Sequence, residues 1–219
     1  MAHKKAFIFD LNGTIIDDME YHVRAWSQLL NGELGAAMDH AAVKAQMYGK
    51  NGELLDRVFG KDYFTPEKVE ELSYKKEHLY QAAYLPDIKL IDGLGGFLRR
   101  AQQLGIPMAI GTAAIMFNVD FILDNLQIRK YFSAIVSADD VATSKPDPET
   151  FLQGAGKLGV EPANCIVFED APKGVETALN AGMKAIVVLS ALHGKDEFSS
   201  YPNIIQFIHS YSEIDPSGI

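Results

Sequence analysis

The sequence predicts an α/β fold: a parallel β-sheet covered by helices on both faces, with an all-helical insertion after the first strand. Beyond residue 87, short apolar runs alternate with segments of helical periodicity, which is typical of parallel strands joined by crossover helices. The runs are apolar throughout, as expected for strands buried on both faces. From about Glu20 to Tyr84 the periodicity is helical and no convincing strand is found.

The elements follow in chain order. The first strand is predicted at residues 5–10, where an apolar run ends in an acidic residue. Three segments of the insertion show helical periodicity, namely 19–30, 41–47 and 66–84. The rest of the chain alternates helices, predicted at 93–105, 118–126, 147–159 and 173–182, with strands, predicted at 106–113, 133–140, 164–170 and 184–189. The sheet therefore contains at least five strands.

These elements define two expected domains. Residues 1–18 and 86–219 would form a Rossmann-like α/β core, and residues 19–85 a small helical cap. The hinges are expected at Pro86 and just before Met19. Within the core, Asp147 is a plausible N-cap for a helix whose first residue is Pro148.

Composition excludes several classes of protein. The chain has 219 residues, 47% of them hydrophobic, so it can bury a substantial core. Its net charge of −9, with both signs mixed along the chain, argues against binding to nucleic acid or to an anionic membrane. The single cysteine, Cys165, cannot form an internal disulfide. The four-residue apolar run before Asp10 is too short for a signal peptide. We expect a cytoplasmic monomer.

Polar side chains follow the predicted core strands. Asp10 closes the first strand, Thr112 the second, and Glu169 and Asp170 the fourth, while Lys145 lies in the loop after the third. In open α/β sheets ligands bind beyond the carboxyl ends of the strands, so these groups are expected to converge. Carboxylates suit a divalent cation, and the ammonium and hydroxyl suit phosphate oxygens.

With these residues in place, the chain resembles the haloacid dehalogenase superfamily of phosphotransferases, in its beta-phosphoglucomutase-like branch. Four motifs occur in the family's order over almost the full length: "DLNGT" at Asp10, Thr112, Lys145 in "SKPDPE", and "EDAPKG" at Glu169 and Asp170. The segment "EYHVRAW" is similar to the one that follows the first motif in this branch.

The resemblance implies a nucleophile and a metal. Asp10 would attack phosphorus and become an aspartyl-phosphate. The Asp10 carboxylate, the backbone carbonyl of Asn12 and Asp170 would hold Mg²⁺. Glu169 would complete the metal site by ordering the metal's waters, or would order Lys145.

The resemblance also implies a substrate site for a small phosphorylated metabolite. Thr112 and Lys145 would bind the transferring phosphoryl group, with Ala113 beside them. His22 in the insertion is either a packed histidine or a substrate-gating one, since it shares a helix face with apolar neighbours. Lys50 is either a solvated lysine or a substrate contact.

Asn12 departs from the family pattern. Relatives usually carry there an aspartate that protonates the leaving group, whereas Asn-Gly between apolar runs also indicates a hairpin turn. Asparagine keeps the turn and the metal-binding carbonyl but cannot transfer a proton, a function typically worth about 10²–10⁴-fold in rate. Either the substrate needs no acid, or His22 or another cap residue supplies the proton, or activity is weak.

The expected function is that of a Mg²⁺-dependent phosphatase acting on a small phosphorylated metabolite such as a sugar phosphate. A phosphomutase is the nearest alternative. Residues 113–116 are apolar where mutases hold a second phosphate, and Gly52 lies near the place of an expected arginine, although Lys50 or Arg24 could compensate. A phosphonate-cleaving hydrolase is a further alternative, because that related branch also lacks the second aspartate and uses a cap lysine, a place that Lys50 could take, although the "EDAPKG" motif fits it less well. The remaining alternative is a non-catalytic phosphometabolite sensor that kept the fold and lost the acid.

Overall fold

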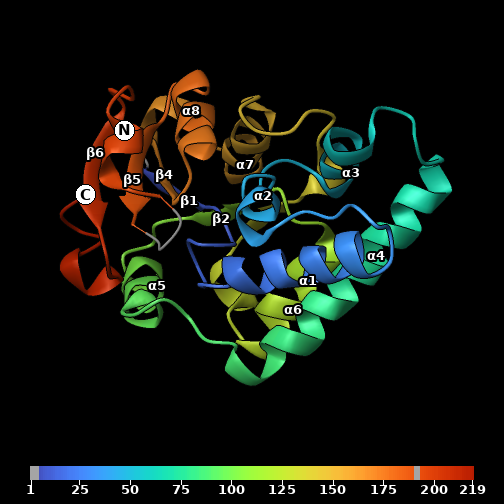
Figure 1. The fold of residues 1–219 in the computed structure, drawn as a ribbon. Coiled ribbons are helices and arrows are strands. Elements are labelled where there is room, and N and C mark those ends of the chain that lie inside the picture. The colour runs from blue at the N-terminus through green and yellow to red at the C-terminus, as the bar shows by residue number, and fades with distance from the viewer. Residues whose placement is uncertain (1–4, 190–192) are drawn as a thin grey trace. The chain divides into compact units, whose positions relative to one another are not determined.

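The computed structural model describes residues 5–189 and 193–219, so residues 1–4 and 190–192 of the expected core domain lie outside the described part. The chain divides into two compact units, shown in Figure 1. The first comprises Met1–Asp17 and Lys89–Ile219, and the second comprises Asp18–Ile88. That the second unit acts as a cap remains a prediction.

The first unit contains a six-stranded parallel sheet with strand order β3-β2-β1-β4-β5-β6. The strands are β1 (Ala6–Phe9), β2 (Met108–Gly111), β3 (Ala134–Val136), β4 (Cys165–Glu169), β5 (Lys184–Val188) and β6 (Ile204–Ile208). This confirms the predicted α/β fold. Strand β6 was not predicted, because this edge strand leaves Ile205 46% exposed and so lacks the continuous apolar run of a buried strand.

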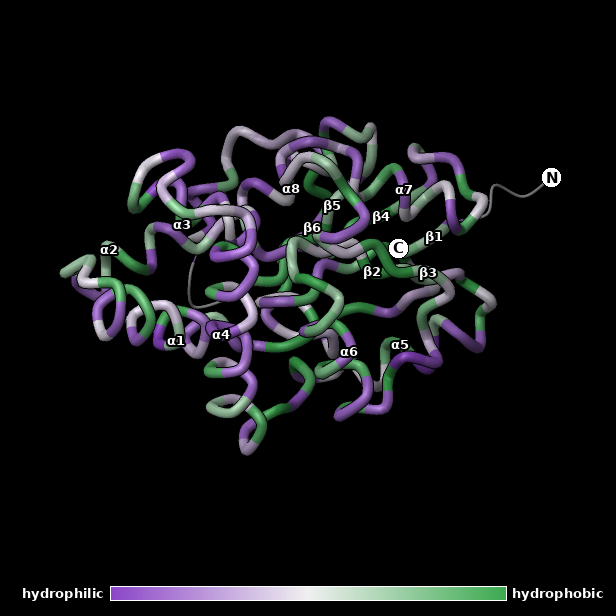
Figure 2. Tube along the Cα trace, turned by 90° about the vertical axis from the view of Figure 1, so that its right-hand side faces the viewer, coloured by the Kyte–Doolittle hydropathy of each residue, from purple (hydrophilic) through white to green (hydrophobic). Residues whose placement is uncertain are grey.

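Helices cover both faces of this sheet. Figures 1 and 2 show α5 and α6 on one face and α7 and α8 on the other. Side chains of β1 alternate between the layers, since Phe7 packs against Phe97 of α5, whereas Ile8 approaches Gly154 of α7. The helices are α5 (Leu94–Gln103), α6 (Met116–Asn125), α7 (Glu149–Leu158) and α8 (Pro172–Asn180).

The start of α7 differs from the prediction. Pro148 is the N-cap residue rather than the first helical residue, and Asp147 accepts a hydrogen bond from the backbone N–H of Glu149 (2.9 Å). The reason is a tight turn in which the N–H of Asp147 donates to the carbonyl of Ser144 (3.1 Å), so the helix begins one residue later.

The second unit is helical in its described elements. Its helices are α1 (Met19–Gly32), α2 (His40–Lys44), α3 (Asn51–Phe59) and α4 (Pro66–Tyr84). They share an apolar core that includes Trp26 of α1 and Leu72 of α4. Helix α3 was not predicted, because the helix opens on Asn51-Gly52, a turn signal. Among residues 5–189 and 193–219, no helix is both long and apolar enough to cross a membrane.

Candidate active site

The strand order reverses between β1 and β4, because the chain builds the sheet outward from β1 in one direction and then returns to build it in the other. Such a reversal opens a crevice beyond the carboxyl ends of the strands. Phe9 of β1 pairs with Phe168 of β4, so Asp10 and Glu169 leave the sheet side by side. The structure thus places the first and fourth motifs together at the reversal point.

Lys145 is the central cation of this site. Its Nζ contacts Asp10 Oδ1 and Glu169 Oε1, both at 2.6 Å, and lies 4.7 Å from the centre of the Phe151 ring. Burial alone would lower the pKa of Lys145, but the two carboxylates outweigh it and raise that pKa. The loop is anchored by Asn180, whose side-chain amide donates to the Pro146 carbonyl (2.9 Å). Lys145 is therefore held as an ammonium between the two motifs.

Three carboxylates can share one cation. Asp10, Glu169 and Asp170 are all buried, and each offers an oxygen within 4.8 Å of the others. Burial, aided by the charge of Glu169, raises the pKa of Asp10 to about 7 although Lys145 opposes the shift. A cluster that carries more negative charge than one lysine balances fits a hard divalent cation such as Mg²⁺.

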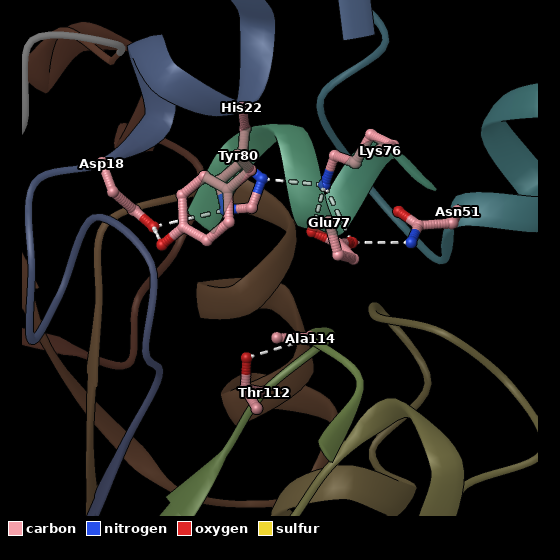
Figure 3. Close-up of polar contacts among 8 residues, drawn as sticks. All are labelled: Asp18, His22, Asn51, Lys76, Glu77, Tyr80, Thr112 and Ala114. Carbon is pink, nitrogen blue, oxygen red and sulfur yellow. Dashed lines mark hydrogen bonds and ion pairs between the residues drawn. The ribbon is translucent and has the colours of Figure 1, made fainter. Parts of the chain in front are cut away.

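Thr112 follows β2, the other neighbour of β1, and is buried. Its Oγ1 accepts a hydrogen bond from the N–H of Ala114 (3.0 Å), as Figure 3 shows. The loop that includes Ala113 is tied back to the core by the Ala138 N–H, which donates to the Ala114 carbonyl (2.9 Å). Thr112 and Ala113 thus lie in a turn that these hydrogen bonds hold in place, directly after the carboxyl end of β2.

Asn12 lies in a tight turn after β1. The Gly13 N–H donates to the Ile16 carbonyl (2.8 Å), and the Ile15 N–H donates to the Leu11 carbonyl (2.8 Å). Gly13 has φ +79°, which favours glycine. The predicted turn at Asn12-Gly13 is therefore present, with an isolated bridge between Asn12 and Ile16. It does not lead into a strand that returns along β1, because β1 is paired on both sides with parallel strands.

His22, on α1, belongs to a buried polar network inside the second unit (Figure 3). Its Nδ1 lies 2.8 Å from Lys76 Nζ, and its Nε2 lies 3.2 Å from Asp18 Oδ2. An ammonium at Lys76 can only donate, so this contact is a hydrogen bond when Nδ1 accepts, which is the tautomer whose Nε2–H faces Asp18. The Tyr80 ring stacks on the His22 imidazole, with 3.8 Å between the ring centres, and the Tyr80 hydroxyl donates a hydrogen bond to Asp18 (2.5 Å). Both ring nitrogens therefore have partners within this unit.

The other half of this network, formed by Lys76, Glu77 and Asn51, was not predicted from the sequence. Lys76 contacts both oxygens of Glu77 at 2.9 Å, and Asn51 donates its side-chain amide to Glu77 (2.7 Å). Lys76 and Glu77 are each 3% exposed. Burial lowers the pKa of Lys76 despite Glu77. Burial would raise the pKa of Glu77, but Lys76, His22 and Asn51 together outweigh it and lower that pKa. In the sequence the pair lies in "YKKEHLY", which looks like a solvated helix face.

Lys50 is the N-cap residue of α3, is half-buried, and donates its backbone N–H to Glu53 Oε2 (3.1 Å). It belongs to the second unit, as His22 does, whereas the motif residues belong to the first. Substrate roles for Lys50 and His22 therefore remain proposals.

Known proteins resemble this chain in sequence and in fold. Residues 4–182 match the sequence profile of the haloacid dehalogenase-like hydrolases. The chain is 33% identical to the fructose-1-phosphate phosphatase YqaB of Escherichia coli, and the match covers 83% of this chain and 94% of the relative. It is 34% identical to the beta-phosphoglucomutase of Bacillus subtilis, and that match covers 84% of this chain and 83% of the relative. A solved haloacid dehalogenase (HAD) hydrolase of Entamoeba histolytica, 28% identical, superposes with a TM-score of 0.86 over 97% of this chain and 96% of that one.

The chain belongs to the haloacid dehalogenase-like hydrolase family. Within this family, the relatives of the chain support its assignment to the beta-phosphoglucomutase-like branch, and they include sugar-phosphate phosphatases. The resemblance predicted from the four motifs is therefore confirmed.

Proposed function

We propose that this chain is a Mg²⁺-dependent phosphatase that hydrolyses a small phosphorylated metabolite, most directly a sugar phosphate, through an aspartyl-phosphate on Asp10. The observation that carries the proposal is the convergence of Asp10, Lys145, Glu169 and Asp170 at the point where the strand order reverses. The named activities of YqaB and of hexitol phosphatase A of E. coli support a sugar-phosphate substrate.

In the first step an Asp10 oxygen bonds to phosphorus while the bond to the leaving oxygen breaks. The leaving oxygen takes up a proton in this step. Water then attacks the same phosphorus and gives up a proton, which balances the first, and phosphate leaves as the Asp10 carboxylate is regenerated. Lys145 holds the carboxylate in place and would bind a phosphoryl oxygen together with Thr112. Asp10, Asp170 and the Asn12 carbonyl would hold Mg²⁺, which would neutralise charge on the phosphoryl oxygens. Both oxygens of Glu169 contact donors of the chain, so we assign it to ordering Lys145.

Phosphate release from a panel of fructose 1-phosphate, β-glucose 1-phosphate, pyrophosphate and a phosphonate, with and without Mg²⁺, tests the proposal. We expect Mg²⁺-dependent release from at least one sugar phosphate. Release from the phosphonate alone would support the phosphonate hydrolase instead, and binding without any release would support a sensor.

A mutase is the second candidate, favoured by the identity to the beta-phosphoglucomutase of B. subtilis. Residues 113–116, Ala-Ala-Ile-Met, provide no charged side chain for a second phosphate. Conversion of β-glucose 1-phosphate into glucose 6-phosphate, faster than phosphate release, would establish the mutase.

Mg²⁺ should raise the melting temperature of the protein, and by more at pH 8 than at pH 5. The folded-state pKa of Asp10, about 7, lies above its ordinary value of 3.8. Without a cation, the contribution of Asp10 to the free energy of unfolding is therefore fully present below about pH 4. It is lost as the pH rises through about 7, where the buried carboxyl group ionises. A bound cation removes the cost of the ionised carboxylate.

Calorimetric melting scans with and without millimolar Mg²⁺ measure this effect. Asp170→Asn should shrink the Mg²⁺ shift, whereas Asp120→Asn, a change to a half-exposed surface ion pair, should keep it. A melting temperature indifferent to Mg²⁺ at both pH values would contradict the metal site.

A further inference from the structure

Two glycines lie directly against the carboxylates of the candidate site. A Cβ atom added at Gly174 would lie 1.7 Å from Glu169 Oε1 and 1.9 Å from its Cδ. A Cβ added at Gly13 would lie 2.0 Å from Asp170 Oδ2. Each distance is far below van der Waals contact, so any side chain at either position displaces a carboxylate of the site.

Glu169 cannot yield to such a side chain without losing contacts. Its Oε2 accepts hydrogen bonds from the backbone N–H groups of Asp170 (2.9 Å) and Ala171 (3.0 Å), and its Oε1 contacts Lys145 at 2.6 Å. The carboxylate is 1% exposed. The Glu169 carboxylate is thus held between the start of α8 and Lys145. It packs directly against Gly174, which lies in the first turn of that helix.

We infer that Gly174 is a positioning residue: its lack of a side chain allows Glu169 to lie against α8 and share the Lys145 ammonium with Asp10. If Glu169 is displaced, the ammonium is left to Asp10 alone and competes with a cation for the Asp10 oxygens. Displacement therefore weakens Mg²⁺ binding. The inference rests on the proposed Mg²⁺ site, and it adds a residue that touches neither the cation nor the substrate.

Gly174 tests this better than Gly13. Gly13 has φ +79°, so a substitution there adds backbone strain to the displacement. Gly174 lies in helix α8 with no such φ, and alanine is the better helix former. Higher helix propensity would therefore raise the melting temperature of Gly174→Ala, whereas displacement of the Glu169 carboxylate would lower it.

Gly156→Ala is the matched control. Gly156 also lies in a helix, α7, and a Cβ added there meets nothing within 4 Å. Mg²⁺ binding is measured by isothermal titration calorimetry on the full chain. We expect Gly174→Ala to weaken the affinity for Mg²⁺ by at least about tenfold, the ratio that 1.4 kcal/mol produces, and Gly156→Ala to leave it unchanged.

A double-mutant cycle assigns the effect to Glu169 even if Gly174→Ala folds poorly. In a Glu169→Ala background the displaced carboxylate is gone, so adding Gly174→Ala should cause no further drop in melting temperature. Wild-type Mg²⁺ affinity in Gly174→Ala, or an equal drop in melting temperature in both backgrounds, would overturn the inference. Failure of the wild-type chain to bind Mg²⁺ would instead overturn the proposed function.

Discussion

Replacing Asp10 by asparagine should abolish both phosphate release and covalent phosphorylation of the protein. Asparagine keeps the size of the side chain, but its amide is a poor nucleophile and carries no charge to pair with Lys145, which contacts Asp10 at 2.6 Å. Loss of a group on which the whole reaction depends lowers turnover by several orders of magnitude. Initial rates with the best sugar phosphate of the panel measure this loss.

The adduct gives a second readout of the Asp10→Asn experiment. Mass spectrometry of protein quenched in acid during turnover should find one phosphoryl group on the wild-type chain and none on Asp10→Asn. Asp120→Asn, a surface change on α6, should behave like wild type in both assays. If Asp10→Asn still acquires the phosphoryl group, the nucleophile is another residue.

Replacing Asn12 by aspartate should raise the rate on sugar phosphates by roughly 10²-fold, the low end of general acid–base catalysis. The new carboxyl group can protonate the departing oxygen and then deprotonate the attacking water. Acyl phosphates, whose leaving groups need no proton, should gain little. Rates of the wild-type chain and the variant on one sugar phosphate and on acetyl phosphate, measured across pH, test the expectation.

The same pair of substrates tests the case in which His22 supplies the proton. In that case Asn12→Asp would change the rate only modestly, and His22→Ala would remove the pH dependence between about pH 5 and 8. Both ring nitrogens of His22 contact side chains of its own unit, Lys76 and Asp18, which favours Asn12 as the position that limits the rate. If neither substitution alters turnover on either substrate, position 12 has no role in proton transfer.

The sequence alone determined the α/β class of the first unit and the place of its motif residues. Apolar runs that alternate with helical segments specify parallel strands, because only burial on both faces stabilises such runs. Polar residues directly after those runs emerge at one edge of the sheet, so the sequence predicts that Asp10 and Glu169 lie at the same edge. That they lie side by side was decided by the pairing of β1 with β4. These signals are local in the sequence.

Tertiary structure decided what depends on packing between distant segments. Nothing in "YKKEHLY" distinguishes Lys76 and Glu77 from a solvated helix face; their burial results from their packing beside His22 of α1 and Asn51 of α3. The space beside Gly174 is likewise defined only by where Glu169 lies after folding. The free energy of a buried charge, or of an added methyl group, depends on the atoms that surround it in space, and sequence neighbours supply only a few of those atoms.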